Sequence, residues 1–128
     1  LSERIKSNPG GYAALANYVF DNTRAAGSTD CASAACDATA LASYDLDRWQ
    51  ENLQSTMPGA RVQTFISSDN NATTGNRQMG VLIGWTLRER NTDTASDYLS
   101  NFIVPALNVN AGVTCWPGYI CHLAYIEP

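Results

Sequence analysis

The sequence predicts an α+β domain in which helices pack on one face of a small antiparallel sheet. Two patterns carry this prediction. Apolar residues recur at helical spacing between Thr39 and Thr56, and they alternate at strand spacing between Met79 and Arg90. With 128 residues, 45% hydrophobic and only 16% charged, the chain is long enough and apolar enough to bury one core. We therefore expect residues 1–128 to form a single domain.

The N-terminal stretch from Leu1 to Ser7 is predicted to be helical, with Leu1 and Ile5 on one face of the helix. Asn8-Pro9-Gly10-Gly11 ends this helix, because proline and glycine interrupt helices. The next stretch, from Tyr12 to Phe20, fits either a short helix or an extended segment, since its apolar residues follow neither period. Both alternatives stay open.

The stretch from Thr39 to Ser68 organises the chain as a helix, a tight stop and a strand. The apolar face of the helix has spacings of four, three and four residues, which are those of Ala42, Leu46, Trp49 and Leu53. Met57-Pro58-Gly59 ends the helix, because the residue before a proline avoids the α region and Gly59 can adopt the left-handed conformation. The strand from Arg61 to Ser67 is rich in β-branched residues.

A second strand is predicted from Met79 to Arg90, with one face formed by Val81, Ile83, Trp85 and Leu87. It pairs with the first strand as an antiparallel hairpin across the polar loop from Ser68 to Gln78. The stretch from His122 to Ile126 forms a last strand beside the second. The predicted core lies between helix and sheet and consists of Leu46, Trp49, Leu53, Val81, Ile83 and Trp85.

The four cysteines allow three pairings, of which we predict the two local ones, Cys31 with Cys36 and Cys115 with Cys121. Each pair lies in a turn-rich stretch, where a short bridge is sterically easy. A metal site is the alternative, but the spacings are wider than those of zinc knuckles and the chain has one histidine. Structural disulfides imply an oxidising compartment.

Little in the sequence points to catalysis, and we expect neither an enzyme nor a cofactor or metal. His122 stands in a predicted strand, without a nucleophile elbow or an oxyanion signature nearby. Asp45 and Asp47 resemble paired carboxylates, but one of them near the start of a helix is more simply a cap or a partner of the positive helix end. The net charge of −4 argues against nucleic-acid binding.

Several segments resemble those of type IV pilus minor pilins of the PilV-like group, in the same order. The most specific matches are Glu3-Arg4-Ile5 running into Asn8-Pro9, then Asp45, Trp49, Leu53, Pro58 and Gly59, then the strand with Trp85. The insert from Asn91 to Gly112 and the second cysteine pair fit the variable, disulfide-bearing C-terminal region of pilins less specifically. The resemblance covers most of the chain.

The resemblance implies a pilin-like fold and a non-enzymatic subunit that joins other minor pilins at the pilus tip, primes assembly and can present an adhesin. It also implies that a long apolar helix precedes Leu1, anchors the subunit in the inner membrane with the domain in the periplasm, and later packs in the extracellular filament. Without that helix, we expect an exposed apolar patch centred on Leu1 and Ile5, through which the domain self-associates weakly or binds another minor pilin.

Two alternatives remain open. A minor pseudopilin of type II secretion shares the helix-plus-sheet plan. A secreted carbohydrate- or peptide-binding module would instead use Trp116, Tyr119 and Tyr125 as an exposed aromatic site. An upstream apolar helix of roughly 20 residues favours the pilin, whereas a cleaved signal peptide favours the binding module.

Overall fold

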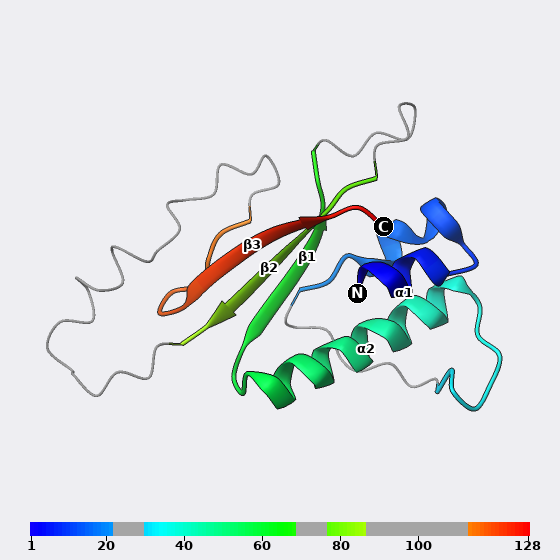
Figure 1. Ribbon diagram of the computed structural model, residues 1–128, viewed down its shortest axis with the longest axis horizontal. Helices are drawn as coiled ribbons and strands as arrows, with labels where there is room; N and C mark the ends of the chain where they lie inside the picture. Colours follow the sequence, from blue (N-terminus) through cyan, green and yellow to red (C-terminus); the bar gives the residue numbers. More distant parts are fainter. Residues whose placement is uncertain (22–29, 69–76, 87–112) are drawn as a thin grey trace, which may run out of the picture.

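A computed structural model of the chain describes residues 1–21, 30–68, 77–86 and 113–128. In these residues it contains three helical segments followed by three strands (Figure 1). Their bounds are α1 (Ser2–Ser7), the 3₁₀ helix η1 (Gly11–Tyr18), α2 (Ala38–Thr56), β1 (Arg61–Ile66), β2 (Met79–Trp85) and β3 (Ile120–Ile126). The predicted α+β class is confirmed.

The long helix α2 has the boundaries that its flanking residues favour. Asp37 is the N-cap, and its carboxylate accepts a hydrogen bond of 2.8 Å from the backbone N–H of Ala40. The helix ends before Met57, and Gly59 has a φ of 81°, the left-handed conformation predicted for it. The chain therefore turns directly from α2 into β1.

The three strands form one antiparallel sheet in the order β1-β2-β3. Val62 lies opposite Ile83 across the first pair of strands, and Val81 lies opposite Ala124 across the second. This confirms both the predicted hairpin and the position of the last strand. The predicted second strand continued to Arg90, but Leu87 and the residues after it, as far as Gly112, lie outside the described residues.

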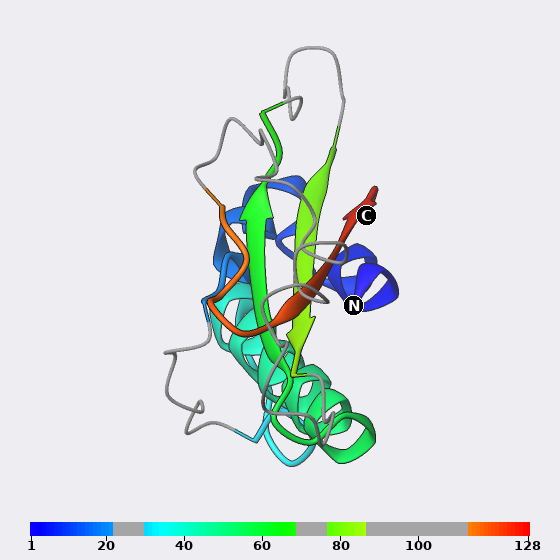
Figure 2. The same ribbon diagram turned by 90° about the vertical axis from the view of Figure 1, so that its left-hand side faces the viewer.

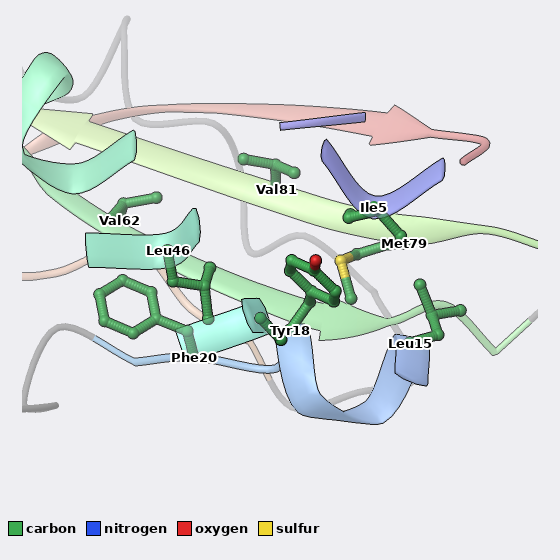
Figure 3. Close-up of a cluster of buried hydrophobic side chains, with 9 residues drawn as sticks. Ile5, Leu15, Tyr18, Phe20, Leu46, Val62, Met79 and Val81 are labelled. Atoms are coloured by element: carbon green, nitrogen blue, oxygen red, sulfur yellow. The ribbon is translucent and has the colours of Figure 1, made fainter. Parts of the chain in front are cut away.

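One face of the sheet is covered by helices, which Figure 1 shows gathered on one side of the strands. Buried residues of all three helical segments meet residues of β1 and β2 in what we call the helix-side cluster (Figure 3). Its members are Ile5, Leu15, Tyr18, Phe20, Ala42, Leu46, Val62, Met79 and Val81. This cluster is the main core of the described residues.

The opposite face carries a smaller core, the loop-side cluster, formed by Phe65, Leu82, Val113 and Cys121. Val113 belongs to the segment that leads into β3, which Figure 2 shows running along the sheet. Gly84 of β2 allows this close packing, because a Cβ there would lie 2.9 Å from Cε3 of Trp116. A side chain at Gly84 would therefore displace the indole.

The predicted core is confirmed in most positions. Leu46 and Val81 are buried in the helix-side cluster, and Trp49, Leu53 and Ile83 are partly buried and pack against it. The prediction that Trp85 is a core residue is wrong, because Trp85 is only partly buried and belongs to neither cluster of the described residues. It is the last residue of β2, beyond the part of the strand that packs against the helix-side cluster.

The stretch from Tyr12 to Phe20, which fitted either a short helix or an extended segment, contains first one and then the other. Residues Gly11–Tyr18 form the 3₁₀ helix η1, and the chain then extends so that Phe20 makes an isolated antiparallel bridge with Thr64 of β1. The mixed period of the sequence follows from this change, because a 3₁₀ helix and an extended bridge bury different sets of side chains.

Candidate functional site

A polar network joins α1, η1 and α2 at the edge of the helix-side cluster, and we call it the N-terminal network. The guanidinium of Arg4 donates to Oδ1 of Asp45 at 2.7 Å, and the hydroxyl of Tyr18 donates to Oδ2 of the same carboxylate at 2.9 Å. The side-chain amide of Asn8 donates to the Tyr18 hydroxyl at 3.1 Å and to the carbonyl of Ala38 at 2.9 Å. One buried carboxylate thus connects three helical segments.

The environment of the network is strongly asymmetric. The side chain of Asp45 is 5% exposed, whereas that of Arg4 is 43% exposed, so the cation reaches the carboxylate from the solvent side. The pKa of Tyr18 is raised to about 12, mainly because the phenol is buried. The hydrogen bond from Asn8 lowers this pKa, whereas the hydrogen bond to Asp45 and the negative charge of Asp45 raise it. The phenol therefore stays protonated and acts as a donor.

The prediction that one of Asp45 and Asp47 is a helix cap or a partner of the positive helix end is wrong. Both lie in the middle of α2, and the cap is Asp37. The sequence signal that was missed is position: Asp45 lies three residues after Ala42 and four before Trp49, on the apolar face, where a charge needs a buried partner. Asp47 is two residues further along the helix and faces another side, so the two carboxylates do not form a catalytic pair.

Both predicted disulfides are present. Cys31 and Cys36 are bridged with a Cα–Cα distance of 5.6 Å, and Cys115 and Cys121 with one of 5.8 Å. The second bridge fastens the start of β3 to the segment before it, and Cys121 is buried in the loop-side cluster. The first bridge lies outside both clusters, just before α2. The two bridges therefore have different structural surroundings.

The three aromatic residues of the binding-module alternative do not form one exposed surface. Trp116 and Tyr119 contact each other edge to face, with ring centroids 6.1 Å apart, and both are partly buried against the loop-side cluster. Tyr125 is 45% exposed and contacts Phe65 instead. An aromatic binding platform needs open ring faces side by side, whereas Trp116 and Tyr119 are partly buried and the exposed Tyr125 contacts Phe65 instead of them.

The predicted apolar patch at the N-terminus is also only partly present. Leu1 is partly exposed and packs against the helix-side cluster, but Ile5 is 4% exposed and is one of the members of that cluster. Ile5 therefore cannot be the centre of an exposed patch. The reason is that α1 packs against η1 and the sheet through this side chain, as Figure 3 shows.

A small cleft of about 190 Å³ opens beside α1 and η1. Its lining combines apolar residues with two cations and consists of Ile5, Lys6, Gly11, Tyr12, Leu15, Arg77 and Pro128. The guanidinium of Arg77 lies over the ring of Tyr12, 5.2 Å from its centroid. The amino group of Lys6 is 3.3 Å from the carboxylate of Glu3. Both cations thus have partners within the domain.

Within the described residues there is no group of three or more metal-ligating side chains, and His122 is exposed on β3. In the same part of the chain, no helix has the length and apolar character needed to cross a membrane. Comparisons with protein-family models, with curated proteins and with solved structures give no match to this chain.

Proposed function

We propose that this protein is a minor pilin of a type IV pilus, a structural subunit that joins other minor pilins in the tip complex and helps to prime assembly. The observation that carries the proposal is the attachment of α1. The residues of the resemblance in α1 and after it, Arg4, Ile5 and Asn8, are the same ones that fasten this helix to the domain. Asp45, another residue of the resemblance, forms the ion pair with Arg4.

The attachment is built from three kinds of contact. Ile5 is buried in the helix-side cluster, Arg4 forms an ion pair with Asp45, and Asn8 bonds to Tyr18 and to the carbonyl of Ala38. Together these contacts restrict translation and rotation of α1 relative to α2. A subunit held in a filament by its N-terminal helix needs such a junction, because the helix sets the orientation of the globular domain.

The proposed location follows from the disulfides and from the resemblance. Two disulfides favour an oxidising, extracytoplasmic compartment. In the proposal, an apolar helix upstream of α1 holds the subunit in the inner membrane, with the domain in the periplasm, until the subunit enters the extracellular pilus. Its partners are other minor pilins and a tip adhesin.

A minor pseudopilin of type II secretion is the nearest alternative, since the same helix-plus-sheet plan serves both. The secreted binding module has less support, because Trp116 and Tyr119 are partly buried against each other. The partners of the full-length protein in its own cell distinguish these possibilities.

The test is photo-crosslinking in the cell from the outer side of α1. A crosslinking residue replaces Glu3, whose side chain is 89% exposed and whose loss removes only an exposed contact with Lys6. We expect adducts with other minor pilins. The matched control replaces Glu51 on α2, which is 65% exposed and lies in a different part of the domain. The control measures crosslinking that does not depend on the α1 surface.

Deletion of the gene provides the second readout. We expect fewer surface pili, with recovery on complementation by the full-length gene. Adducts with secretion pseudopilins and normal piliation would support the pseudopilin instead. Unchanged piliation together with adducts to neither class would contradict both assembly roles.

A further inference from the structure

Strand β3 is an edge of the sheet, and among the described residues no strand pairs with its outer side. Its sequence, Ile120–Ile126 (ICHLAYI), contains no Asp, Glu, Lys, Arg or Pro. Natural sheets protect their edges with charges, prolines, bulges or covering segments, because an open edge is a template for another strand. β3 carries none of the first two protections.

The register shows which backbone groups point outward from β3. Thr64 of β1 exchanges both of its backbone hydrogen bonds with Phe20, at 3.3 and 2.8 Å, so its groups point away from β2. Its neighbour across the pair, Val81, must then direct its N–H and C=O toward Ala124 of β3. Since direction alternates along a strand, the N–H and C=O of Cys121, Leu123 and Tyr125 point outward.

The segment that precedes β3 lies over the sheet rather than along this edge. Val113 lines a groove next to Phe20 and Thr64, on the β1 side of the sheet. Trp116 lies over Gly84 of β2. These described residues therefore cover a face of the sheet and not the outer side of β3. At the C-terminal end of this edge the Ser2 hydroxyl donates to the carbonyl of Glu127 at 3.5 Å, while no hydrogen bond within the described part of the chain uses the outward groups of Leu123.

We infer that β3 pairs with β3 of a second copy of this chain, antiparallel, about a two-fold axis at Leu123. In this register Leu123 faces its own equivalent, and Cys121 faces Tyr125 of the second copy. These are the residues whose backbone groups point outward, so each facing pair can exchange two hydrogen bonds. The pairing is isologous, and it joins the two sheets into one.

Charge placement favours the second copy as the occupant of this edge. In the same register Glu127 of one copy lies opposite Tyr119 of the other. The guanidinium of Arg61 is 4.9 Å from the centroid of the Tyr119 ring, on the sheet face where Glu127 arrives. The two-fold axis brings these opposite charges together twice. The net charge of −4 on each copy opposes association, but salt screens it over about 8 Å at physiological ionic strength.

The inference is tested by sedimentation velocity of the full chain across a wide range of concentrations, and it does not depend on the proposed function. We expect a monomer–dimer equilibrium. Leu123→Pro removes an N–H that points outward and leaves the hydrogen bonds to β2 in place, so it should abolish the dimer. Leu123→Ala is the matched control: it truncates the same side chain but keeps the N–H, and it should still dimerise. Circular dichroism checks that both variants fold.

A charge exchange tests the register. Arg61→Glu and Glu127→Arg should each weaken the dimer about fivefold, and the double variant should restore it. Arg61 and Glu127 lie at opposite ends of the sheet within one copy, so recovery reports a contact between copies. Glu51→Arg on α2 makes the same change in net charge as Glu127→Arg and should leave the dimer unchanged.

Three results would overturn the inference. A wild-type chain that stays monomeric at all concentrations would show that the edge is covered or unused, whether by another part of the chain or by a different protein. A dimer that survives Leu123→Pro would place the interface elsewhere. Single and double charge variants of equal affinity would exclude the proposed register.

Discussion

The helix-side cluster draws its buried residues from α1, η1, α2 and two strands, whereas the loop-side cluster is a small group completed by a disulfide and aromatic side chains. The first is assembled by regular elements that come together across the whole sequence. The second is held by a local covalent bridge between Cys115 and Cys121. The domain thus stabilises the two faces of its sheet by different means.

Polar groups are also used differently on the two faces. The helix-side cluster adjoins the N-terminal network, in which Asp45 is buried with two hydrogen-bonding partners. The loop-side face has an edge-to-face pair of Trp116 and Tyr119, with Arg61 over the ring of Tyr119. Hydrogen bonds with directional geometry orient helices in one case, and aromatic packing fills space in the other.

The largest expected effect is on the helix-side cluster. Leu46→Ala should lower the free energy of unfolding by about 3 kcal/mol, because Leu46 is 1% exposed and its loss leaves a cavity between α2 and the sheet. Urea denaturation measures the change. Leu53→Ala, on the same helix but only partly buried, is the control and should cost less. Equal costs would show that burial does not rank these sites.

The second prediction compares the two bridges. Replacing Cys115 and Cys121 by serine should cost about 2 kcal/mol from chain entropy alone, plus a further loss because Cys121 belongs to the loop-side cluster. The matched control replaces Cys31 and Cys36, which close a loop of similar length outside both clusters.

Amide hydrogen exchange locates the effect of these two double variants. We expect faster exchange in β3 for the Cys115/Cys121 variant, with α2 still protected. Indistinguishable stabilities and exchange patterns would mean that the second bridge acts only on the unfolded chain.

A smaller effect is expected when a hydroxyl group of the N-terminal network is removed. Tyr18→Phe removes the hydroxyl that donates to Asp45 and accepts from Asn8, and should cost about 1.5 kcal/mol in the free energy of unfolding. Tyr125→Phe is the matched control, because Tyr125 is exposed on the other face, and should change it by less than about 0.5 kcal/mol. If Tyr18→Phe left the free energy of unfolding unchanged, the network would orient α1 without stabilising the fold.

The smallest expected effect is a change in the free energy of unfolding at alkaline pH, and it is absent at neutral pH. The pKa of Tyr18 is about 12 in the folded chain and 10.0 for an ordinary tyrosine, so the unfolded chain loses this proton first. The corresponding stability is complete below pH 10 and is lost as the pH rises toward 12. Urea denaturation at increasing pH should therefore show that the free energy of unfolding falls more steeply for the wild type than for Tyr18→Phe. Parallel curves would contradict the raised pKa.

The local elements could be predicted because their signals are local. Helix α2 follows from one apolar face, with its end from Pro58 and Gly59, and the alternation in β2 follows from the pleat of a strand. The disulfides also followed from proximity in sequence, since Cys31–Cys36 and Cys115–Cys121 each span only a few residues. The α+β class comes directly from these elements.

The N-terminal network and the fate of Trp85 could not be predicted in the same way. Arg4 and Asp45 are 41 residues apart, and only the packing of α1 on η1 and α2 brings them together. Trp85 has the right alternation for a core position, but its exposure depends on which elements cover the end of β2. The resemblance to minor pilins selected Asp45 without indicating that it would be buried.

The sequence alone was enough to predict α2 and the three strands, because periodicity and turn residues act between near neighbours. Only the tertiary structure decided that Ile5 is a core residue, that Asp45 is a buried ion-pair partner and that the outer side of β3 has no paired strand among the described residues. Burial and pairing depend on residues far apart in the chain, and their cost or gain exists only once those residues meet.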